Sequence, residues 1–314
     1  MKKLKIRIAE GADFSPEVVL KLEAYFTVDL APCSAKDIPS ILSSYDVFWF
    51  RLGFRISEKD IPANPRCKVI ATPVTGIDHI DTAACEKASI GIISLKGEVD
   101  FLRTVRATAE HTILLTLMLL RHPQQAIRSV NEGIWNRDLF RGNEVYGKTV
   151  GIVGLGRLGE IVGSYFQAMG AVVIGFDKHD RVVPGVAQVR SLEEIAQRSD
   201  IISIHLSLDA STNKIINESF LGLVKKECIL INTSRGGIVD EKALLFALEN
   251  GLIKAAAVDV LQDEQAGVAG NPLVAYAKTH DNLVITPHLG GNTYESFRKT
   301  EHFIAGKIIS FFGV

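Results

Sequence analysis

The sequence has few cysteines, no long apolar run and almost no net charge. Its four cysteines, among 314 residues, lack the paired spacing of a zinc site or a disulfide framework, which favours a reducing compartment. The longest apolar run, residues 112–120, is too short to span a bilayer. Lys and Arg (35) nearly balance Asp and Glu (36), so a basic surface for nucleic acid or anionic lipid is not expected. These features predict a soluble cytoplasmic protein that binds no metal, nucleic acid or membrane.

Short apolar strands alternate with helical patterns along the chain, which predicts βαβ units and parallel sheets. In the first part, strands are expected at 4–9, 27–30, 46–50, 68–71 and 91–94, and helices at 16–26, 35–44, 57–63 and 80–89. A long helix over 104–121 is apolar over most of its second half, as expected for a helix buried in a core or at a subunit interface. Six strands of a doubly wound sheet and a C-terminal helix follow, at 149–153, 171–176, 201–205, 228–232, 255–258, 283–286 and 293–312.

A glycine pattern stands in the context that a dinucleotide-binding loop requires. Gly154, Gly156 and Gly159 fit G-x-G-x-x-G directly after the expected strand at 149–153 and open a helix. Such glycines permit a tight turn, close approach of the backbone to a pyrophosphate, and close contact of helix and strand. The helix N-terminus offers free amides and a positive dipole end to the phosphates. The glycine pattern alone is weak evidence for a binding site. The strand before it and the helix after it favour a dinucleotide-binding loop over a glycine turn that binds no ligand.

An acidic residue ends the strand that follows the glycine loop. Asp177 can accept hydrogen bonds from the ribose hydroxyls of the cofactor, and its charge would repel a 2′-phosphate. NAD is therefore favoured over NADP. Lys178 and His179 weaken this preference slightly.

Three polar residues follow later strands of the same expected sheet. Arg235, Glu264 and His288 would all lie at the edge that carries the glycine loop, because the strands are parallel. Arg235 can bind the carboxylate or carbonyl oxygen of a 2-hydroxy acid. His288 can exchange the hydroxyl proton, and Glu264 can orient the imidazole and favour its charged form. Each residue by itself would be interpreted as a solvated or structural side chain. Their joint placement at one sheet edge favours an active site instead.

The motifs around these residues resemble those of the D-isomer-specific 2-hydroxyacid dehydrogenases over most of the chain. The segments are VGIVGLGRLG, NTSRGGIVDEKAL, AAAVDVLQDEQ and TPHLGGNT. The resemblance implies that Arg235 binds substrate and that His288 is the acid/base. It points to Glu264, rather than Asp259 or Asp263, as the partner of His288.

The resemblance also implies the residues that contact the two ligands. Cofactor contacts are implied for Gly154, Gly156, Arg157, Leu158, Gly159, Asp177, His205, Leu206, Thr233, Ser234, Asp259 and His288. Substrate contacts are implied for Arg51, Val74, Thr75, Gly76 and Arg235, with the loop TGIDHID supplying backbone amides.

The resemblance further implies an NAD-binding Rossmann domain, residues 97–288, inserted into a flavodoxin-like α/β substrate domain, residues 1–96 and 289–314. The active site would then lie in the interdomain cleft, with hinges near 97 and 288. The segment ATAEHT resembles the start of the long helix that relatives use to dimerise, so a homodimer through the helix at 104–121 is expected.

Several departures from the family pattern leave the substrate open. Gln265 and Ser207 stand where proline is common, Gly290-Gly291 is more flexible than the usual pair, and the segment 97–107 is longer than in many members. Five arginines could suit a phosphorylated or dianionic acid, although each alone reads as a solvated surface charge: Arg51, Arg55, Arg103, Arg106 and Arg141. Phosphoglycerate dehydrogenases belong to the family, and at 314 residues the chain is not expected to carry the regulatory domain that many of them have.

The leading interpretation is an oxidoreductase that transfers a hydride between NAD(H) and a small D-2-hydroxy acid or 2-oxo acid, with phosphorylated acids such as 3-phosphoglycerate among the candidates. One alternative is an NADPH-dependent glyoxylate or hydroxypyruvate reductase. The other is a non-enzymatic, NAD-sensing binding module like the corepressors of this fold.

Overall fold

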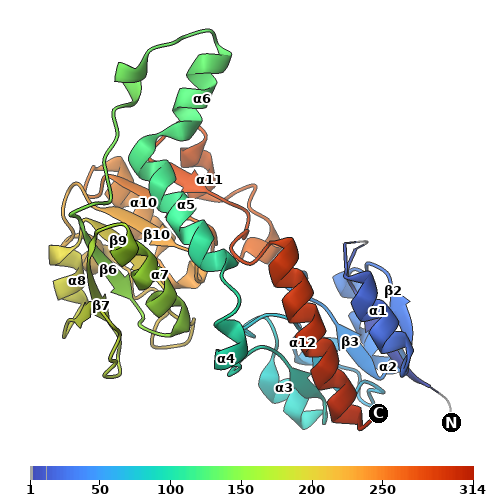
Figure 1. The fold of residues 1–314 in the computed structure, drawn as a ribbon. Coiled ribbons are helices and arrows are strands. Elements are labelled where there is room, and N and C mark those ends of the chain that lie inside the picture. Colours follow the sequence, from blue (N-terminus) through green and yellow to red (C-terminus); the bar gives the residue numbers. More distant parts are fainter. Residues whose placement is uncertain (1–2, 12) are drawn as a thin grey trace. The chain divides into compact units, whose positions relative to one another are not determined.

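The computed structural model describes residues 3–11 and 13–314, which form two compact units (Figure 1). One contains the residues up to Val105 together with Asn292–Val314, and the other is Arg106–Gly291. Each unit is built on a parallel sheet with helices, which confirms the predicted α/β fold class. The expected domain boundaries, 96/97 and 288/289, lie nine and three residues earlier than the boundaries between these units (105 − 96 = 9 and 291 − 288 = 3). The assignment of substrate and cofactor domains to these units stays a prediction.

The first unit has a five-stranded parallel sheet in the order β2-β1-β3-β4-β5, the flavodoxin-like order. The strands β3 and β4 are buried along their whole length, as strands covered on both faces must be. One face packs against α1 and α12, and the other against α2 and α3. The bounds are β1 Leu4–Ile8, α1 Pro16–Glu23, β2 Phe26–Leu30, α2 Ile38–Ser44, β3 Val47–Trp49, β4 Val69–Ala71, α3 Thr82–Lys87, β5 Gly91–Ile93, α4 Val99–Leu102 and α12 Tyr294–Phe312.

The second unit has a seven-stranded parallel sheet in the order β12-β11-β10-β9-β6-β7-β8. The strand order reverses between β6 and β9, and open α/β sheets bind ligands at such a switch point. The six expected strands are present as β6 Thr149–Val153, β7 Val172–Phe176, β9 Ile201–Ile204, β10 Ile229–Asn232, β11 Ala255–Val258 and β12 Leu283–Ile285. The edge strand β8, Val186–Gln188, was not expected. Its residues are partly or fully exposed, and its sequence has no run of apolar residues that would indicate a strand.

Helices cover both faces of this second sheet. One face packs against α5, Ala107–Arg121, and α7, Arg157–Ala168. The other face packs against α8 Leu192–Arg198, α9 Glu218–Leu221, α10 Glu241–Glu249 and α11 Pro272–Ala277. The helix α6, Pro123–Asn131, and the turn η3, Arg137–Phe140, extend beyond the sheet of this unit (Figure 1).

Two expected helices differ from the structure. The helix expected over 104–121 begins at Ala107, and the separate short helix α4 precedes it. The helix expected over 57–63 is wrong: the segment forms a single 3-10 turn, Glu58–Asp60. The reason is that Ile61 precedes Pro62 and takes an extended conformation (φ −94°, ψ 117°), as the ring of a following proline favours.

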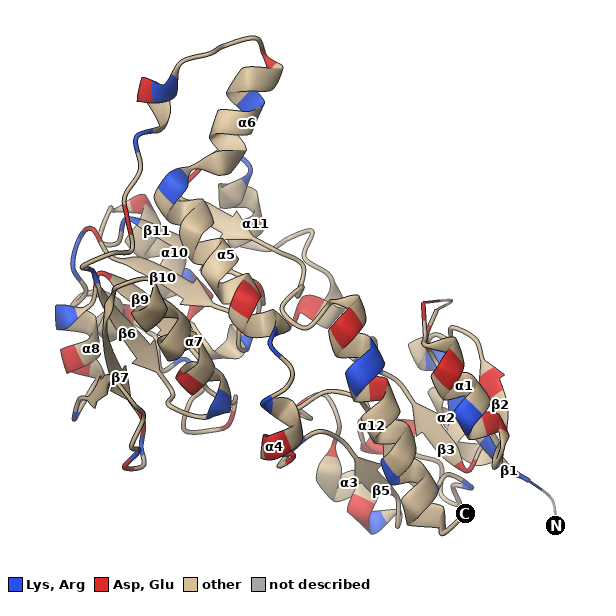
Figure 2. Ribbon diagram, in the orientation of Figure 1, with Lys and Arg blue, Asp and Glu red and all other residues tan. Residues whose placement is uncertain are grey.

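Charged residues of both signs are interspersed on the elements of both units, for example on α1, α8 and α12 (Figure 2). No helix among the described residues is long and apolar enough to cross a membrane.

Candidate functional site

The glycine loop lies at the switch point of the second sheet. A Cβ on Gly154 would lie 2.6 Å from the carbonyl oxygen of His205, and φ at Gly154 is 96°, a value that favours glycine. A Cβ on Gly159 would lie 2.0 Å from the carbonyl oxygen of Gly154, so α7 starts in direct contact with the turn. A Cβ on Gly156 would meet nothing within 4 Å. This open backbone at the start of α7 fits the close approach of a pyrophosphate.

The carboxylate of Asp177 borders the glycine loop from the end of β7. One oxygen accepts a hydrogen bond from the backbone N–H of Leu155 (2.9 Å), and the other accepts one from that of His179 (3.0 Å). These bonds hold the carboxylate beside the loop, where it has lone pairs left for ribose hydroxyls. The Nε atom of Arg181 lies 4.0 Å from one Asp177 oxygen, so a cation also stands at this position.

His205 follows β9 and closes the other side of the glycine loop. Its backbone N–H donates to Val153 O (2.7 Å), and its Nε2 lies 2.8 Å from Ser203 Oγ. Burial lowers the pKa of His205 to about 3, and the charge of Arg157 acts in the same direction. The imidazole is therefore neutral at physiological pH and acts as a fixed dipole beside the loop.

The turn after β10 carries Arg235. The amide side chain of Asn232 closes this turn: its oxygen accepts from Ser234 N (3.0 Å) and Oγ (2.7 Å), and its nitrogen donates to Arg235 O (3.0 Å). A Cβ on Gly236 would lie 2.1 Å from the carbonyl carbon of Leu261. The Arg235 turn is thus packed directly on the loop that follows β11.

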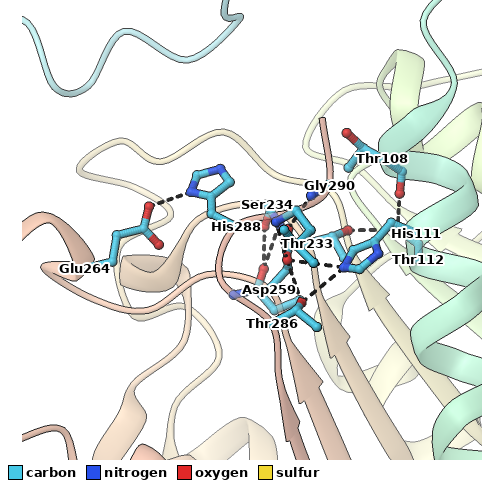
Figure 3. Close-up of polar contacts among 12 residues, drawn as sticks. Thr108, His111, Thr112, Thr233, Ser234, Asp259, Glu264, Thr286, His288 and Gly290 are labelled. Carbon is cyan, nitrogen blue, oxygen red and sulfur yellow. Dashed lines mark hydrogen bonds and ion pairs between the residues drawn. The ribbon is translucent and has the colours of Figure 1, made fainter. Parts of the chain in front are cut away.

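The same loop brings Glu264 to His288, which follows β12 (Figure 3). His288 Nδ1 and Glu264 Oε1 are 2.5 Å apart, and the two side chains are 25% and 29% exposed. The other Glu264 oxygen accepts a hydrogen bond from Leu261 N (3.2 Å), which ties the glutamate to its own loop. Because Nδ1 is engaged, Nε2 is the ring nitrogen that can exchange a proton with a ligand. The structure therefore brings Glu264 and His288 together beside the Arg235 turn.

Asp259 holds the loop that carries His288. Its buried carboxylate accepts hydrogen bonds from the backbone N–H groups of Leu289 (2.7 Å) and Gly290 (2.7 Å) and from Thr286 Oγ1 (2.5 Å). Burial by itself would raise the pKa of this carboxyl, but the hydrogen bonds from His111, Thr286, Leu289 and Gly290 outweigh it and leave the pKa below its ordinary value. Asp259 is thus kept as an anion that organises the backbone from Thr286 to Gly290.

Three side-chain contacts from α5 to this edge were not expected from the sequence. His111 Nε2 lies 3.2 Å from Asp259 Oδ1 and 3.1 Å from Thr286 Oγ1. Thr112 Oγ1 lies 2.8 Å from Thr233 Oγ1 (Figure 3). A signal was present, because Thr108, His111 and Thr112 have the i, i+3, i+4 spacing of one helical face within an apolar helix.

Arg51, expected to bind substrate, lies at the carboxyl edge of the first sheet and already has carboxylate partners. Its Nη1 lies 2.8 Å from Glu10 Oε2, its Nη2 pairs with Glu301, and Asp13 is 3.8 Å away. The guanidinium also lies over the ring of Phe297, 3.8 Å from its centroid. The side chain is only 14% exposed. Arg51 thereby joins β1, β3 and α12 of the first unit.

The loop after β4 carries the other expected substrate contacts. Val74 and Gly76 are half-buried and Thr75 is exposed. The carbonyl of Val74 accepts a hydrogen bond from Leu95 N (3.1 Å), which anchors the start of the loop. These three residues lie at the same edge of the first sheet as Arg51.

Comparison with known proteins gives a family match that covers most of the second unit. Residues 113–290 match the model described as "D-isomer specific 2-hydroxyacid dehydrogenase, NAD binding domain". This confirms the expectation of NAD as the cofactor of this domain. A D-3-phosphoglycerate dehydrogenase from Methanocaldococcus jannaschii is 36% identical over 267 residues, which cover 84% of this chain and 49% of the relative. The chain thus spans about half the length of the curated relatives that it matches first.

Solved structures are similar over nearly the whole chain. A D-lactate dehydrogenase from Aquifex aeolicus, complexed with NAD and lactic acid, has a TM-score of 0.87 and 25% identity, and the match covers 98% of this chain and 95% of that one. An acyclic imino acid reductase (Bsp5), in complex with NADPH and D-Arg, has a TM-score of 0.85 and 27% identity, with 99% and 97% covered.

Proposed function

Because the chain belongs to the D-isomer specific 2-hydroxyacid dehydrogenase family, we propose that it is an NAD-dependent oxidoreductase that interconverts a small D-2-hydroxy acid and its 2-oxo acid. The observation that carries this proposal is the pair of His288 and Glu264, 2.5 Å apart. The pair lies at the sheet edge that also bears the glycine loop and the turn of Arg235.

Each residue of this edge has a role in the proposed reaction. His288 Nε2 takes the hydroxyl proton in oxidation and returns it to the carbonyl oxygen in reduction. Glu264 holds the imidazole through Nδ1, so that Nε2 faces the reacting oxygen. Arg235 binds the carboxylate or carbonyl oxygen of the acid through its fork of donors. Arg51 and the loop of Val74, Thr75 and Gly76 are proposed to contact the remainder of the substrate.

The cofactor is proposed to lie along the switch point of the second sheet. Gly154, Gly156 and Gly159, with the start of α7 at Arg157 and Leu158, would hold the pyrophosphate, and Asp177 would hold the ribose. His205, Leu206, Thr233, Ser234 and Asp259 would border the rest of the dinucleotide. When bound, NAD supplies the group that accepts or donates the hydride.

Among acids, a phosphorylated 3-phosphoglycerate-like substrate is one candidate, supported by the identity to D-3-phosphoglycerate dehydrogenases. Against it stands the charge around Arg51, which is surrounded by Glu10, Asp13 and Glu301 and has little positive field to offer a dianion. A monoanionic acid meets less repulsion there.

NADPH as the preferred cofactor is a second candidate, in the form of a glyoxylate or hydroxypyruvate reductase. The observation that favours it is Arg181, whose Nε lies 4.0 Å from Asp177 Oδ1. A guanidinium at this place could bind a 2′-phosphate. The carboxylate of Asp177 favours NAD instead.

We also propose that the protein is a cytoplasmic homodimer. Its four cysteines are free thiols, in keeping with a reducing compartment. The second unit exposes large apolar side chains on α5, on α6 and after it: Leu114 (51%), Ile127 (61%), Val130 (51%), Ile134 (48%), Trp135 (90%) and Leu139 (62%). A patch of this kind suits an interface with a second copy. Replacing Trp135 and Ile127 by serine should convert the dimer to a monomer in analytical ultracentrifugation.

The proposed activity is tested by NADH oxidation against a panel of 2-oxo acids: 3-phosphohydroxypyruvate, hydroxypyruvate, glyoxylate, pyruvate and sugar-derived 2-oxo acids. Steady turnover of one member, with a lower KM for NADH than for NADPH, is the expected result. A lower KM for NADPH would select the second candidate. NADH binding without turnover of any acid in the panel would contradict the proposed oxidoreductase activity and favour a non-enzymatic, NAD-sensing binding module.

A further inference from the structure

Three polar side chains stand on one face of the largely apolar helix α5. Thr108, His111 and Thr112 are spaced i, i+3 and i+4, so they project from the same side of the helix. The side chain of His111 is 11% exposed, and Thr112 is buried. A polar side chain on a buried face costs stability unless it is hydrogen-bonded, so the partners of these residues show what the face is for.

Each of the three side chains contacts a different part of the site described above. Thr112 meets Thr233 in the turn that carries Arg235. His111 meets Asp259 after β11 and Thr286 after β12. Thr108 packs on Gly290, where an added Cβ would lie 3.1 Å from Thr108 Cγ2. One helix face thus touches the loops after three neighbouring strands (Figure 3).

The contact of His111 with Asp259 acts on the backbone that carries His288. Asp259 Oδ1 accepts from His111 and from Leu289 N, and Oδ2 accepts from Gly290 N. A buried carboxylate that loses one donor must draw on its remaining donors or on water. The remaining donors belong to residues 286–290, so we infer that a change at His111 disturbs the loop that sets the position of His288.

We propose that the face of Thr108, His111 and Thr112 is a positioning element that holds the loops of Arg235 and His288 in register with each other. The inference rests on the proposed function of that site. None of the three residues is assigned a contact with a ligand, so they act through Thr233, Asp259 and Gly290. Misplacement of a reacting group by about 1 Å can lower a rate by about 100-fold, so a remote clamp of this kind has a measurable effect on turnover.

The first test compares His111→Leu with His111→Gln. Leucine removes the donor, whereas glutamine keeps an N–H donor of similar reach. We expect His111→Leu to lower kcat by about 10-fold to 100-fold, the range seen when outer partners of active-site groups are lost, while the KM for NADH changes little. His111→Gln should recover most of the loss. Equal kinetics in the two variants would overturn the role of His111, whether both resemble the wild type or both are impaired.

The second test compares Thr112→Val with Thr116→Val, a matched control on the same helix. Both hydroxyls are buried and donate to the carbonyl four residues earlier (2.8 Å each), but within the described part of the chain only that of Thr112 also meets Thr233. Thr112→Val should lower kcat by several-fold, and Thr116→Val should leave it near wild type. The same kcat in both variants would show that the Thr112–Thr233 contact positions nothing.

A third measurement separates this inference from the proposed function. Hydrogen–deuterium exchange of the peptide 286–290 reports the amides that Asp259 binds, with no need for turnover. Exchange should be faster in His111→Leu than in wild type and near wild type in His111→Gln, at equal melting temperatures. Equal exchange in all three proteins would overturn the positioning role even if the enzyme is active. Absence of turnover in the wild type, with the expected exchange pattern, would overturn the proposed function alone.

Discussion

Asp259 and Glu10 are both mostly buried carboxylates that follow a strand at the carboxyl edge of a parallel sheet, one in each unit, yet their pKa values move in opposite directions. Burial raises the pKa of Glu10, and the charge of Arg51 and its backbone N–H offset this only in part. Burial acts on Asp259 in the same sense, but the donors around it outweigh burial and lower its pKa. The direction of each pKa shift is therefore set by the number of hydrogen-bond donors that the carboxylate accepts from and by the acidic side chains beside it.

The difference shows two uses of the same sheet edge. In the second unit, side-chain and backbone donors surround one carboxylate, and the result is an ordered loop that presents His288. In the first unit, Glu10, Asp13 and Glu301 crowd one guanidinium, and the result is a clasp that ties α12 to the strands. We therefore expect substitutions of the acids in this clasp to act mainly on stability, and substitutions around His288 to act mainly on rate.

The largest effect is expected at His288. His288→Ala should lower kcat by about 100-fold to 10,000-fold, because it removes the proposed proton carrier, and should leave the melting temperature within a few degrees of wild type. Steady-state kinetics and thermal denaturation measure the two. His302→Ala, at an exposed histidine of the first unit, is the control and should change neither. Wild-type turnover in His288→Ala would remove this residue from the chemistry.

For the clasp around Arg51, we expect a loss of stability without a loss of cofactor binding. Glu301→Gln should lower the free energy of unfolding by about 3 kcal/mol, because it leaves the buried guanidinium of Arg51 with less compensation. Denaturant unfolding measures the loss, and the affinity for NADH should not change. Glu17→Gln removes an exposed ion pair with Arg298 and should cost less than about 1 kcal/mol. An equal cost in both variants would contradict the clasp.

Arg235→Ala should raise the KM for the 2-oxo acid and lower kcat, so that kcat/KM falls by about 10-fold to 100-fold, while NADH binding stays near wild type. The reason is that, of the two ligands, the guanidinium is proposed to contact the acid and not the cofactor. Stopped-flow binding of NADH and steady-state kinetics separate the two effects. Unchanged kinetics would exclude Arg235 from the site.

The smallest expected effect is on the pH dependence of stability. Since the pKa of Glu10 is raised in the folded protein, the folded state binds the proton more tightly than the unfolded state. Stability should therefore fall as pH rises from the ordinary glutamate pKa of 4.5 through the raised pKa of the folded state. Glu10→Gln should remove this slope from denaturation curves taken between the ordinary pKa and neutrality. A slope that is unchanged in the variant would contradict the raised pKa.

Apart from β8, the sequence was sufficient for the strands of both sheets, because buried parallel strands read as apolar runs between helical patterns. It missed α6, which is largely polar, and β8 at a sheet edge. It placed Arg235, Glu264 and His288 at one edge by topology, and their roles stay predictions. It could not supply the contact of His111 with Asp259, because these residues are 148 positions apart and no local pattern encodes such a pair. Likewise, Arg51 and Arg235 both read as cations after strands, and no local pattern shows that Asp13 and Glu301 pair with Arg51.

The backbone of His288 is left-handed (φ 55°), a conformation that costs a residue with a side chain roughly 1–2 kcal/mol and glycine very little. The conformation of His288 therefore lowers the stability of the fold at the position where the proposed reaction needs an imidazole. A glycine there would relax the chain and abolish the ring together, so the His288→Gly variant should outlast the His288→Ala variant on heating, although both lack the ring. At this residue, the backbone conformation lowers thermal stability, and the side chain that it carries is the one proposed to transfer the proton.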